Sequence, residues 1–254
     1  MYHSWPHTTT IPFPPDHKLT YLFPPQGPIA DTIVVYAKTA PSLGSKGISA
    51  FILSTDSTPG FSCTRSLSKL GMRGSPTGEL AFSDVFLPRS SLLGPLHGGV
   101  QVLMSGLDIE RLVLSSGPIG IMQACLDVSL PYIHQRKQFG KAIAEHQLVQ
   151  GKVADMYTKM AAARAFTMST AAELDRGGEV LTRDCAAAIL FAAERGTECA
   201  LDAIQLLGGM GYVTEMPAGR LLRDAKLYEI GAGTSEVRRW VIGRGFNKEF
   251  GVGG

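Results

Sequence analysis

The hydrophobic pattern adopts a helical period at Gly98 and keeps it almost to the end of the chain. From there on, apolar residues recur every three or four positions in segments that turn residues separate. These segments cover residues 98–134, 147–174, 182–208, 218–229 and 234–242. Long helices that are rich in small residues and joined by short loops pack side by side, so we predict an antiparallel helical bundle over residues 96–250.

The residues before this bundle have a strand pattern instead. Runs of β-branched and alternating apolar residues are separated by clusters of Ser, Thr, Gly and Pro. The runs cover residues 31–37, 47–53, 61–67 and 79–87. We predict a small, mostly antiparallel sheet of about four strands over residues 27–95. The fold class is therefore α+β, a small β-sheet domain followed by a helical bundle.

The start of the chain differs from both parts. Residues 1–28 hold seven of the 15 prolines, together with His3, His7 and His17. Proline has no backbone N–H and restricts the residue before it, so a long helix or a central strand is excluded. We expect residues 1–26 to be irregular, and these histidines to be solvated rather than metal ligands.

Composition narrows the function classes. The 24 Lys and Arg residues exceed the 22 Asp and Glu residues by only two, and no basic stripe is present, which makes a nucleic-acid partner improbable. No apolar stretch is long enough to span a bilayer without Ser, Gly or Pro. The four cysteines are far apart, so we expect buried reduced thiols and no metal site. No targeting segment is visible.

Two charged segments within apolar surroundings are candidates for chemistry. The first places Asp108, Glu110 and Arg111 inside an otherwise apolar helix. A carboxylate that faces a bundle interior needs a cation partner, unless its raised pKa serves a catalytic base. The pattern alone favours an ion pair with Arg111 or another cation.

The second segment, residues 231–236, leads from Gly231 into Thr and Ser at a helix start. Such a start exposes backbone N–H groups to an anion, although a capped helix explains it equally well. The glycines of residues 208–212 do not follow a strand, so they fail the context of a dinucleotide fingerprint. On pattern alone they are a helix end and a turn.

Several separated motifs, taken together and in order, resemble the acyl-CoA dehydrogenase family. The motifs are Lys69–Ser75, Gly106–Arg111, Arg136–Gly140, Gly208–Tyr212, Arg223–Lys226 and Tyr228–Glu236. Each motif is weak alone, but their common order over more than 200 residues is specific. The resemblance runs from about Gly27 to Phe250 and, within the family, is greatest to the isovaleryl-CoA dehydrogenase branch.

The resemblance links the two charged segments. Most members of the family carry a catalytic glutamate in the loop, where this chain has Ala232. The isovaleryl-CoA dehydrogenase branch carries the base on the long helix, at the position of Glu110. The implied reaction is FAD-dependent α,β-dehydrogenation of a short branched acyl-CoA, isovaleryl-CoA to 3-methylcrotonyl-CoA, in leucine catabolism. Glu110 would remove the α-proton, and the Ala232 N–H would bind the thioester oxygen.

The resemblance also implies binding residues. FAD contacts are expected at Arg136, Gln147, Gln205, Leu206, Leu207, Gly208, Gly209, Thr234, Ser235 and Glu236, the first two on the FAD of a neighbouring subunit. Substrate contacts are expected at Ser45, Lys46, Gln101, Asp108, Ile109, Arg111, Ala232 and Gly233. Gln101 stands where relatives in this branch carry tyrosine, which leaves the acyl-chain preference open. An electron-transfer flavoprotein as electron acceptor, a homotetramer and the mitochondrial matrix are implied as well.

The family pattern has a further part that is not matched here. Members have an N-terminal helical domain before the sheet, and we expect this domain and the first strands to be absent. Residues 1–26 match nothing in the family, and the sheet domain is then partial, with an exposed edge. An alternative function follows: a catalytically inactive truncated fragment that acts only as an assembly or structural bundle.

Overall fold

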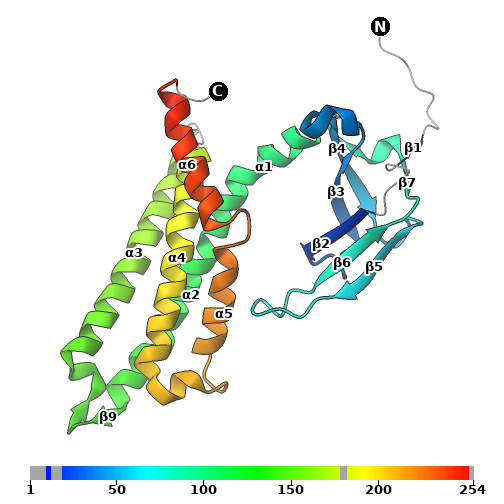
Figure 1. Cartoon of the computed structure of the whole chain (residues 1–254). Helices are drawn as coiled ribbons and strands as arrows, with labels where there is room; N and C mark the ends of the chain where they lie inside the picture. The colour runs from blue at the N-terminus through cyan, green and yellow to red at the C-terminus, as the bar shows by residue number, and fades with distance from the viewer. Residues whose placement is uncertain (1–9, 13–18, 178–181, 252–254) are drawn as a thin grey trace. The chain divides into compact units, whose positions relative to one another are not determined.

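The computed structural model describes residues 10–12, 19–177 and 182–251. Two compact units divide the chain: residues 1–69 with 73–106, and residues 70–72 with 107–254. The division falls inside helix α1 (Gly99–Leu114) (Figure 1). His3, His7 and His17 lie outside the described residues.

The first unit contains two three-stranded antiparallel sheets rather than one sheet of four strands. One has the order β2 (Leu19–Pro25), β6 (Thr77–Phe82), β5 (Phe61–Ser66), and the other β3 (Thr32–Lys38), β4 (Ile48–Ser54), β8 (Leu92–Leu93). The remaining elements are β1 (Thr10–Pro12), β7 (Phe86–Pro88), and the 3-10 helices η1 (Pro41–Gly47) and η2 (Arg89–Ser91).

The division into two sheets follows from where the apolar faces lie. Alternate residues of β3, β4 and β6 form one core, which includes Val35, Phe51, Leu53, Leu80 and Phe82. Each sheet has one apolar face, and burying the two faces against each other removes both from water. A single four-stranded sheet would have left that face uncovered. The strands expected at 31–37, 47–53 and 61–67 and the antiparallel pairing are confirmed. The single sheet is wrong, and the strand expected at 79–87 is divided into β6 and β7.

The expectation of an irregular start is also wrong for part of residues 1–26. The described residues there form β1, which pairs with β7, and β2, which pairs with β6. β2 lies at the edge of its sheet. An edge strand needs ladder hydrogen bonds on one side only, so Pro24 and Pro25 are compatible with it.

The second unit is the predicted antiparallel bundle. After α1 come α2 (Ser116–Gln135), α3 (Gln147–Asp175), α4 (Thr182–Leu207), α5 (Ala218–Tyr228) and α6 (Ser235–Glu249). The connections include β9 (Lys137–Gln138), β10 (Lys141–Ala142), η3 (Ile143–Glu145) and η4 (Gly208–Tyr212). The expected helix over 98–134 is interrupted at Ser115, whose hydroxyl donates to the Leu112 carbonyl and lies 3.1 Å from the Thr167 hydroxyl. Such side-chain bonds to a helix's own backbone bend it.

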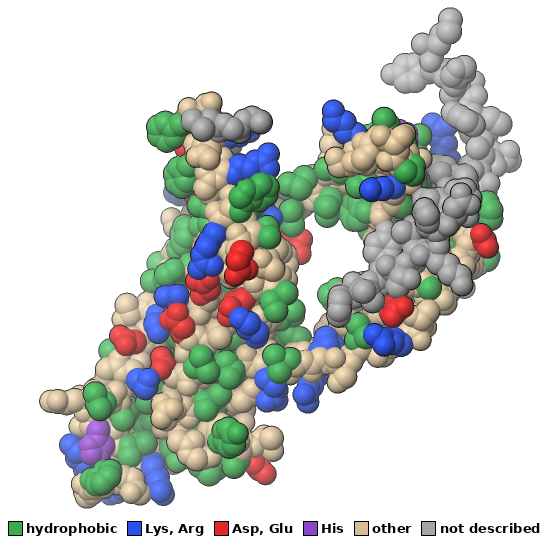
Figure 2. Space-filling model, viewed as in Figure 1, with side chains coloured by type: hydrophobic (Ala, Val, Ile, Leu, Met, Phe, Trp, Pro, Cys, Tyr) green, Lys and Arg blue, Asp and Glu red, His purple; other side chains and the backbone are tan. Residues whose placement is uncertain are grey.

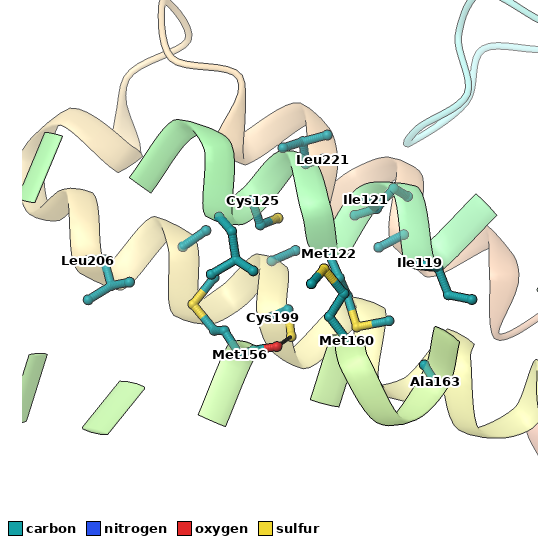
Figure 3. Packing of buried hydrophobic residues seen from close by; sticks show 14 of the residues in the cluster. Ile119, Ile121, Met122, Cys125, Met156, Met160, Ala163, Cys199, Leu206 and Leu221 are labelled. Carbon is teal, nitrogen blue, oxygen red and sulfur yellow. Dashed lines mark hydrogen bonds between the residues drawn. The ribbon is translucent and has the colours of Figure 1, made fainter. Parts of the chain in front are cut away.

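Helix α4 is the centre of the bundle, because it packs against α2, α3, α5 and α6. The core around it contains Met122, Cys125, Met156, Met160 and Cys199 (Figure 3). Small residues allow the helices to approach closely: a Cβ on Gly196 of α4 would lie 2.9 Å from the Pro118 Cβ of α2. This small-residue packing is what the alanine-rich helices predicted.

The cysteines agree with the expectation at three positions and contradict it at one. Cys125, Cys185 and Cys199 are buried free thiols, whereas Cys63 on β5 is exposed. Burial raises the pKa of Cys125 and of Cys199 to about 12, so both stay protonated. Cys63 is exposed because β5 lies at the edge of its sheet and faces solvent along most of its length.

The surface of the bundle carries charges of both signs. Figure 2 shows Lys and Arg side chains interspersed with Asp and Glu over the helices on this face. The stretch Gly99–Gln135 is long and apolar enough to cross a membrane by length and composition, and 44% of its most apolar window is buried inside the protein. Its buried residues on α2 pack into the bundle core, as those of a core helix do.

Candidate functional site

The charged turn of α1 separates its two carboxylates. Asp108 pairs with Arg111, with 3.0 Å between Oδ1 and Nη1, and its Oδ2 accepts a hydrogen bond from the Thr182 hydroxyl at 2.5 Å. Glu110 is exposed, and its side chain has no hydrogen bond or ion pair within the described part of the chain. The expected ion pair therefore exists for Asp108. The Glu110 carboxylate has no partner among those residues, so it is available to accept a proton.

Glu110 lies at the edge of a shallow hollow of about 290 Å³ in the second unit. The hollow is lined by Glu110, Val113, Leu114, Ser116, Gly117 and Tyr228. The Tyr228 ring lies directly over Gly117, where an added Cβ would be 2.3 Å from the phenol oxygen. Burial, and then the charge of Asp224, raise the pKa of Tyr228, so its hydroxyl stays protonated at neutral pH. The lining of the hollow is therefore mainly apolar, and Glu110 supplies its one carboxylate.

The loop from α5 to α6 is held in an unusual conformation. Ala232 and Gly233 both have positive φ, 55° and 97°. The Ser235 N–H donates to the Glu229 carbonyl at 2.9 Å and closes the loop, while the Glu229 carboxylate accepts from Thr197 and Lys226. No carboxylate projects from residues 230–233, because the sequence there is Ile-Gly-Ala-Gly.

The start of α6 is a capped helix. The Thr234 hydroxyl accepts a hydrogen bond from the Val237 N–H at 3.4 Å. The helix N-terminal backbone N–H and the Thr234 hydroxyl lower the pKa of Glu236. The Ser235 Oγ is buried and has no hydrogen-bond partner among the residues that the structure describes. A buried hydroxyl without a partner is uncommon in a folded protein and calls for an explanation.

The residues expected to contact FAD form two groups along the bundle (Figure 1). Arg136 and Gln147 flank the connection from α2 to α3 and are exposed, and Gln205, Gly208 and Gly209 are exposed at the end of α4. These lie at the end of the bundle near β9, away from the group Thr234–Glu236. The side chains of Leu206 and Leu207 are buried, which leaves only their backbone for a cofactor.

The residues expected to contact substrate belong to both units of the chain. Ser45 and Lys46 are exposed in η1 of the first unit, and Gln101 is exposed in the first turns of α1. Ile109 is exposed beside Glu110. The Arg111 side chain is 5% exposed and paired with Asp108, so direct contact with a CoA chain does not fit it.

Sequence reasoning gave no role to Tyr228 or Arg238. Tyr228 begins the motif Tyr228–Glu236. It lies next to Gly117 only because α2 packs against α5, and no local pattern reveals that packing. The apolar residues Val237 and Trp240 of α6 are exposed, and Ser235 and Arg238 are buried instead. An inward-facing arginine contradicts the usual polarity of a helix face, so the pattern could not find it.

We expect no metal site. Within the described ranges, no group of three or more His, Cys, Asp or Glu side chains could hold a metal ion.

The motif Lys69–Ser75 contacts helix α5. The Met72 N–H donates to Asp224 Oδ1 at 2.6 Å, and Gly71 lies against the Arg223 backbone, where a Cβ would not fit. Two motifs far apart in the sequence therefore meet beside α5.

Comparison with known proteins identifies the family of the chain. Residues 97–246 match the family model of the acyl-CoA dehydrogenase C-terminal domain, and residues 23–85 match that of its middle domain. The chain is 63% identical over 223 residues to the mitochondrial isovaleryl-CoA dehydrogenase of Solanum tuberosum. The matched region covers 88% of this chain and 54% of that protein. It is 58% identical over 218 residues to the mitochondrial 2-methylacyl-CoA dehydrogenase of the same species, covering 86% and 52%.

A solved structure of the butyryl-CoA dehydrogenase from Megasphaera elsdenii matches with a TM-score of 0.87 and 35% identity, covering 94% of this chain and 63% of that one. The chain spans about half the length of the curated relatives it matches. The motifs, the fold and these matches agree, and the chain belongs to the acyl-CoA dehydrogenase family.

Proposed function

We propose that this chain carries the catalytic base and part of the binding site for FAD-dependent α,β-dehydrogenation of a short branched acyl-CoA, isovaleryl-CoA to 3-methylcrotonyl-CoA. The observation that supports this most is the pair formed by Glu110 and the loop. Glu110 is an unpaired carboxylate beside a mainly apolar hollow, and the loop has Ala232 where a carboxylate would compete for the same proton.

Glu110 is the residue that removes the α-proton. Its neighbour Asp108 is held by Arg111 and Thr182, so Glu110 is the carboxylate of this turn that is free to turn toward a substrate. A bound acyl chain would cover the hollow and exclude water from the carboxylate that takes the proton. Val113 and Leu114 supply apolar surface for that chain.

The loop supplies the second element of the reaction. Removing the α-proton places negative charge on the thioester oxygen, and a fixed N–H group aimed at that oxygen stabilises it. The Ala232 N–H takes this role in our proposal, and Gly233 contacts the same substrate. Small residues at 231–233 leave room for a branch on the acyl chain. Ser45, Lys46, Gln101, Asp108 and Ile109 would contact the remaining substrate.

The residues near α6 fit the polar part of FAD. The unpaired Ser235 Oγ would offer a hydrogen bond, and Glu236 is an ionised acceptor there. FAD, when bound, accepts the β-hydrogen together with its electron pair. Arg136, Gln147, Gln205, Gly208 and Gly209 lie at the other end of the bundle, and this separation supports a contact with the FAD of a second subunit in a homo-oligomer.

Further parts of the proposal rest on the relatives. Both relatives carry the word mitochondrial in their names, which supports the mitochondrial matrix as the location of this chain. An electron-transfer flavoprotein would accept the electrons. The acyl groups in the names of the two relatives carry their methyl branch on different carbons. A 2-methylacyl-CoA is therefore the second candidate substrate. A segment corresponding to the family's N-terminal domain would complete the flavin site, and without it the bundle would serve assembly alone.

The test begins with the visible spectrum of the purified chain with and without FAD, followed by isovaleryl-CoA under anaerobic conditions. Uptake of FAD and bleaching of its band by the thioester supports the proposal, and a protein that takes up no FAD supports the assembly role. In the flavin-loaded protein, Glu110→Gln should slow bleaching about 10²–10⁴-fold while isovaleryl-CoA still binds.

Glu173→Gln is the matched control, since Glu173 is an exposed residue at the end of α3 that pairs with Arg176 on the surface. It should bleach at the wild-type rate. Undiminished bleaching by Glu110→Gln would exclude Glu110 as the base. Repeating the titration with a 2-methylacyl-CoA ranks the two candidate substrates.

A further inference from the structure

The peptide between Gly231 and Ala232 lies in a loop that backbone hydrogen bonds close at both ends. Ala232 lies in the left-handed region, which is unfavourable for an alanine and persists only where surrounding contacts hold it. Backbone hydrogen bonds close the loop on either side, from the Gly231 N–H to the Leu227 carbonyl at 2.8 Å and from the Ser235 N–H to the Glu229 carbonyl at 2.9 Å. Neither of them touches the peptide that joins Gly231 to Ala232.

A buried arginine makes that contact. Arg238 Nη2 donates to the Gly231 carbonyl at 2.6 Å, a short charge-assisted hydrogen bond. Throughout the described residues, no other side chain hydrogen-bonds the backbone of residues 231–233. Gly231 C=O and Ala232 N–H belong to one planar peptide, so a bond that fixes the oxygen also fixes the direction of the N–H.

Arg238 is costly where it lies. Its side chain is fully buried, and Nε and Nη1 have no acceptor in the described part of the protein. No carboxylate in that part lies within ion-pair distance of it, and its charged neighbours are Arg111, Glu194 and Glu229. Burial and the positive charge of Arg111 lower the pKa of Arg238. A buried arginine without an ion-pair partner costs stability that an apolar residue would not.

We propose that Arg238 is a positioning residue of the proposed active site: it orients the Gly231–Ala232 peptide so that the Ala232 N–H is held ready for the thioester oxygen. The proposal rests on the function proposed above. A guanidinium bound to the carbonyl also polarises the peptide, which makes the N–H on its other side a stronger donor. The buried positive charge behind the loop favours negative charge that develops in front of it.

Two measurements separate this role from a purely structural one. The first is amide hydrogen exchange of the 254-residue chain, which needs no cofactor and no activity. Arg238→Met should raise exchange at Ala232 and Gly233 about tenfold or more, while amides of the α4 core keep their rates. Arg244→Met is the control, because Arg244 is an exposed arginine of α6 that lies over the Trp240 ring, and it should leave the loop unchanged.

The second measurement is the infrared carbonyl frequency of isovaleryl-CoA labelled with ¹³C at the thioester carbon. It is taken on the flavin-loaded Glu110→Gln protein, in which turnover is expected to be about 10²–10⁴-fold slower, before the flavin band bleaches. Binding should lower the frequency, Arg238→Met should abolish most of that shift, and Arg238→Lys should restore part of it. If Arg238→Met does not fold, Arg238→Lys compared with Arg244→Lys carries the same test with a smaller expected effect.

The outcomes distinguish the two proposals. Loop exchange that stays at the wild-type rate in Arg238→Met, or a bound carbonyl frequency that does not change, overturns the positioning role and leaves the proposed function intact. A wild-type protein that binds no acyl-CoA overturns the proposed function and the positioning role with it. Faster exchange confined to the loop, together with the lost frequency shift, supports both.

Discussion

The close approach of α2 and α4 at Gly196 gives a sharp test of the bundle packing. Inside a helix, Gly→Ala usually stabilises by about 0.5–1 kcal/mol, because glycine loses more backbone entropy on folding. At Gly196 the new Cβ would lie 2.9 Å from the Pro118 Cβ, and Pro118 is fully buried and next to Gly117 of the proposed site. Forcing an extra methyl group into a packed core costs about 1–3 kcal/mol.

Gly151 of α3 is the matched control for this substitution. It is exposed in the interior of a helix, and an added Cβ meets no atom within 4 Å. Gly151→Ala should therefore raise the free energy of unfolding by about 0.5–1 kcal/mol. Gly196→Ala should lie about 1–3 kcal/mol below it, because helix propensity cancels in the difference and the clash remains.

Urea denaturation followed by far-UV circular dichroism measures both free energies under the same conditions. Both variants should keep the wild-type m-value, which makes the midpoints directly comparable. Equal stabilisation by the two substitutions would refute the close approach of Gly196 to Pro118.

Three further results are expected. Thr234→Ala should lower the free energy of unfolding by about 0.5–2 kcal/mol in urea titrations and Thr234→Ser by less, because the hydroxyl caps α6; equal losses would contradict the cap. Alkylation at pH 8, read by mass spectrometry, should label Cys63 rapidly and Cys125 and Cys199 only on unfolding; equal rates would contradict their burial. Stability should fall as pH rises from 9 toward 12, by up to about 1.4 kcal/mol per pH unit for each of these two thiols, because the folded state keeps a proton that the unfolded state loses. Denaturant titrations across that range measure the slope, which should flatten in Cys125→Ala; an unchanged slope in that variant would be inconsistent with its raised pKa.

The helical elements could be predicted closely from the sequence. The expected helix over 147–174 is α3 (Gln147–Asp175), and the expected opening at Thr234 is the N-cap of α6. This agreement has a local cause. A bundle helix buries one face, so its apolar residues repeat with the helical period, and its ends carry glycine or capping hydroxyls.

The errors arose where burial depends on distant partners. The run at 79–87 has clear alternation, yet alternation states which face is apolar and not which sheet covers it. Cys63 and Trp240 look like core residues and are exposed, while Arg238 looks like a surface residue and is fully buried. Only the neighbours that surround a position determine its burial.

The sequence by itself determined the family, the helical bundle and the choice of Glu110 as the candidate base, because ordered motifs and the replacement of a loop carboxylate by Ala232 are properties of residue identity. The tertiary structure decided which of the two carboxylates on this turn is paired. Asp108 is bound by Arg111 and Thr182, and the Glu110 carboxylate has no partner among the described residues. It also placed Arg238 on the Gly231 carbonyl. Hydrogen bonds and ion pairs join residues that are far apart in the chain, and their partners exist only once the helices have packed.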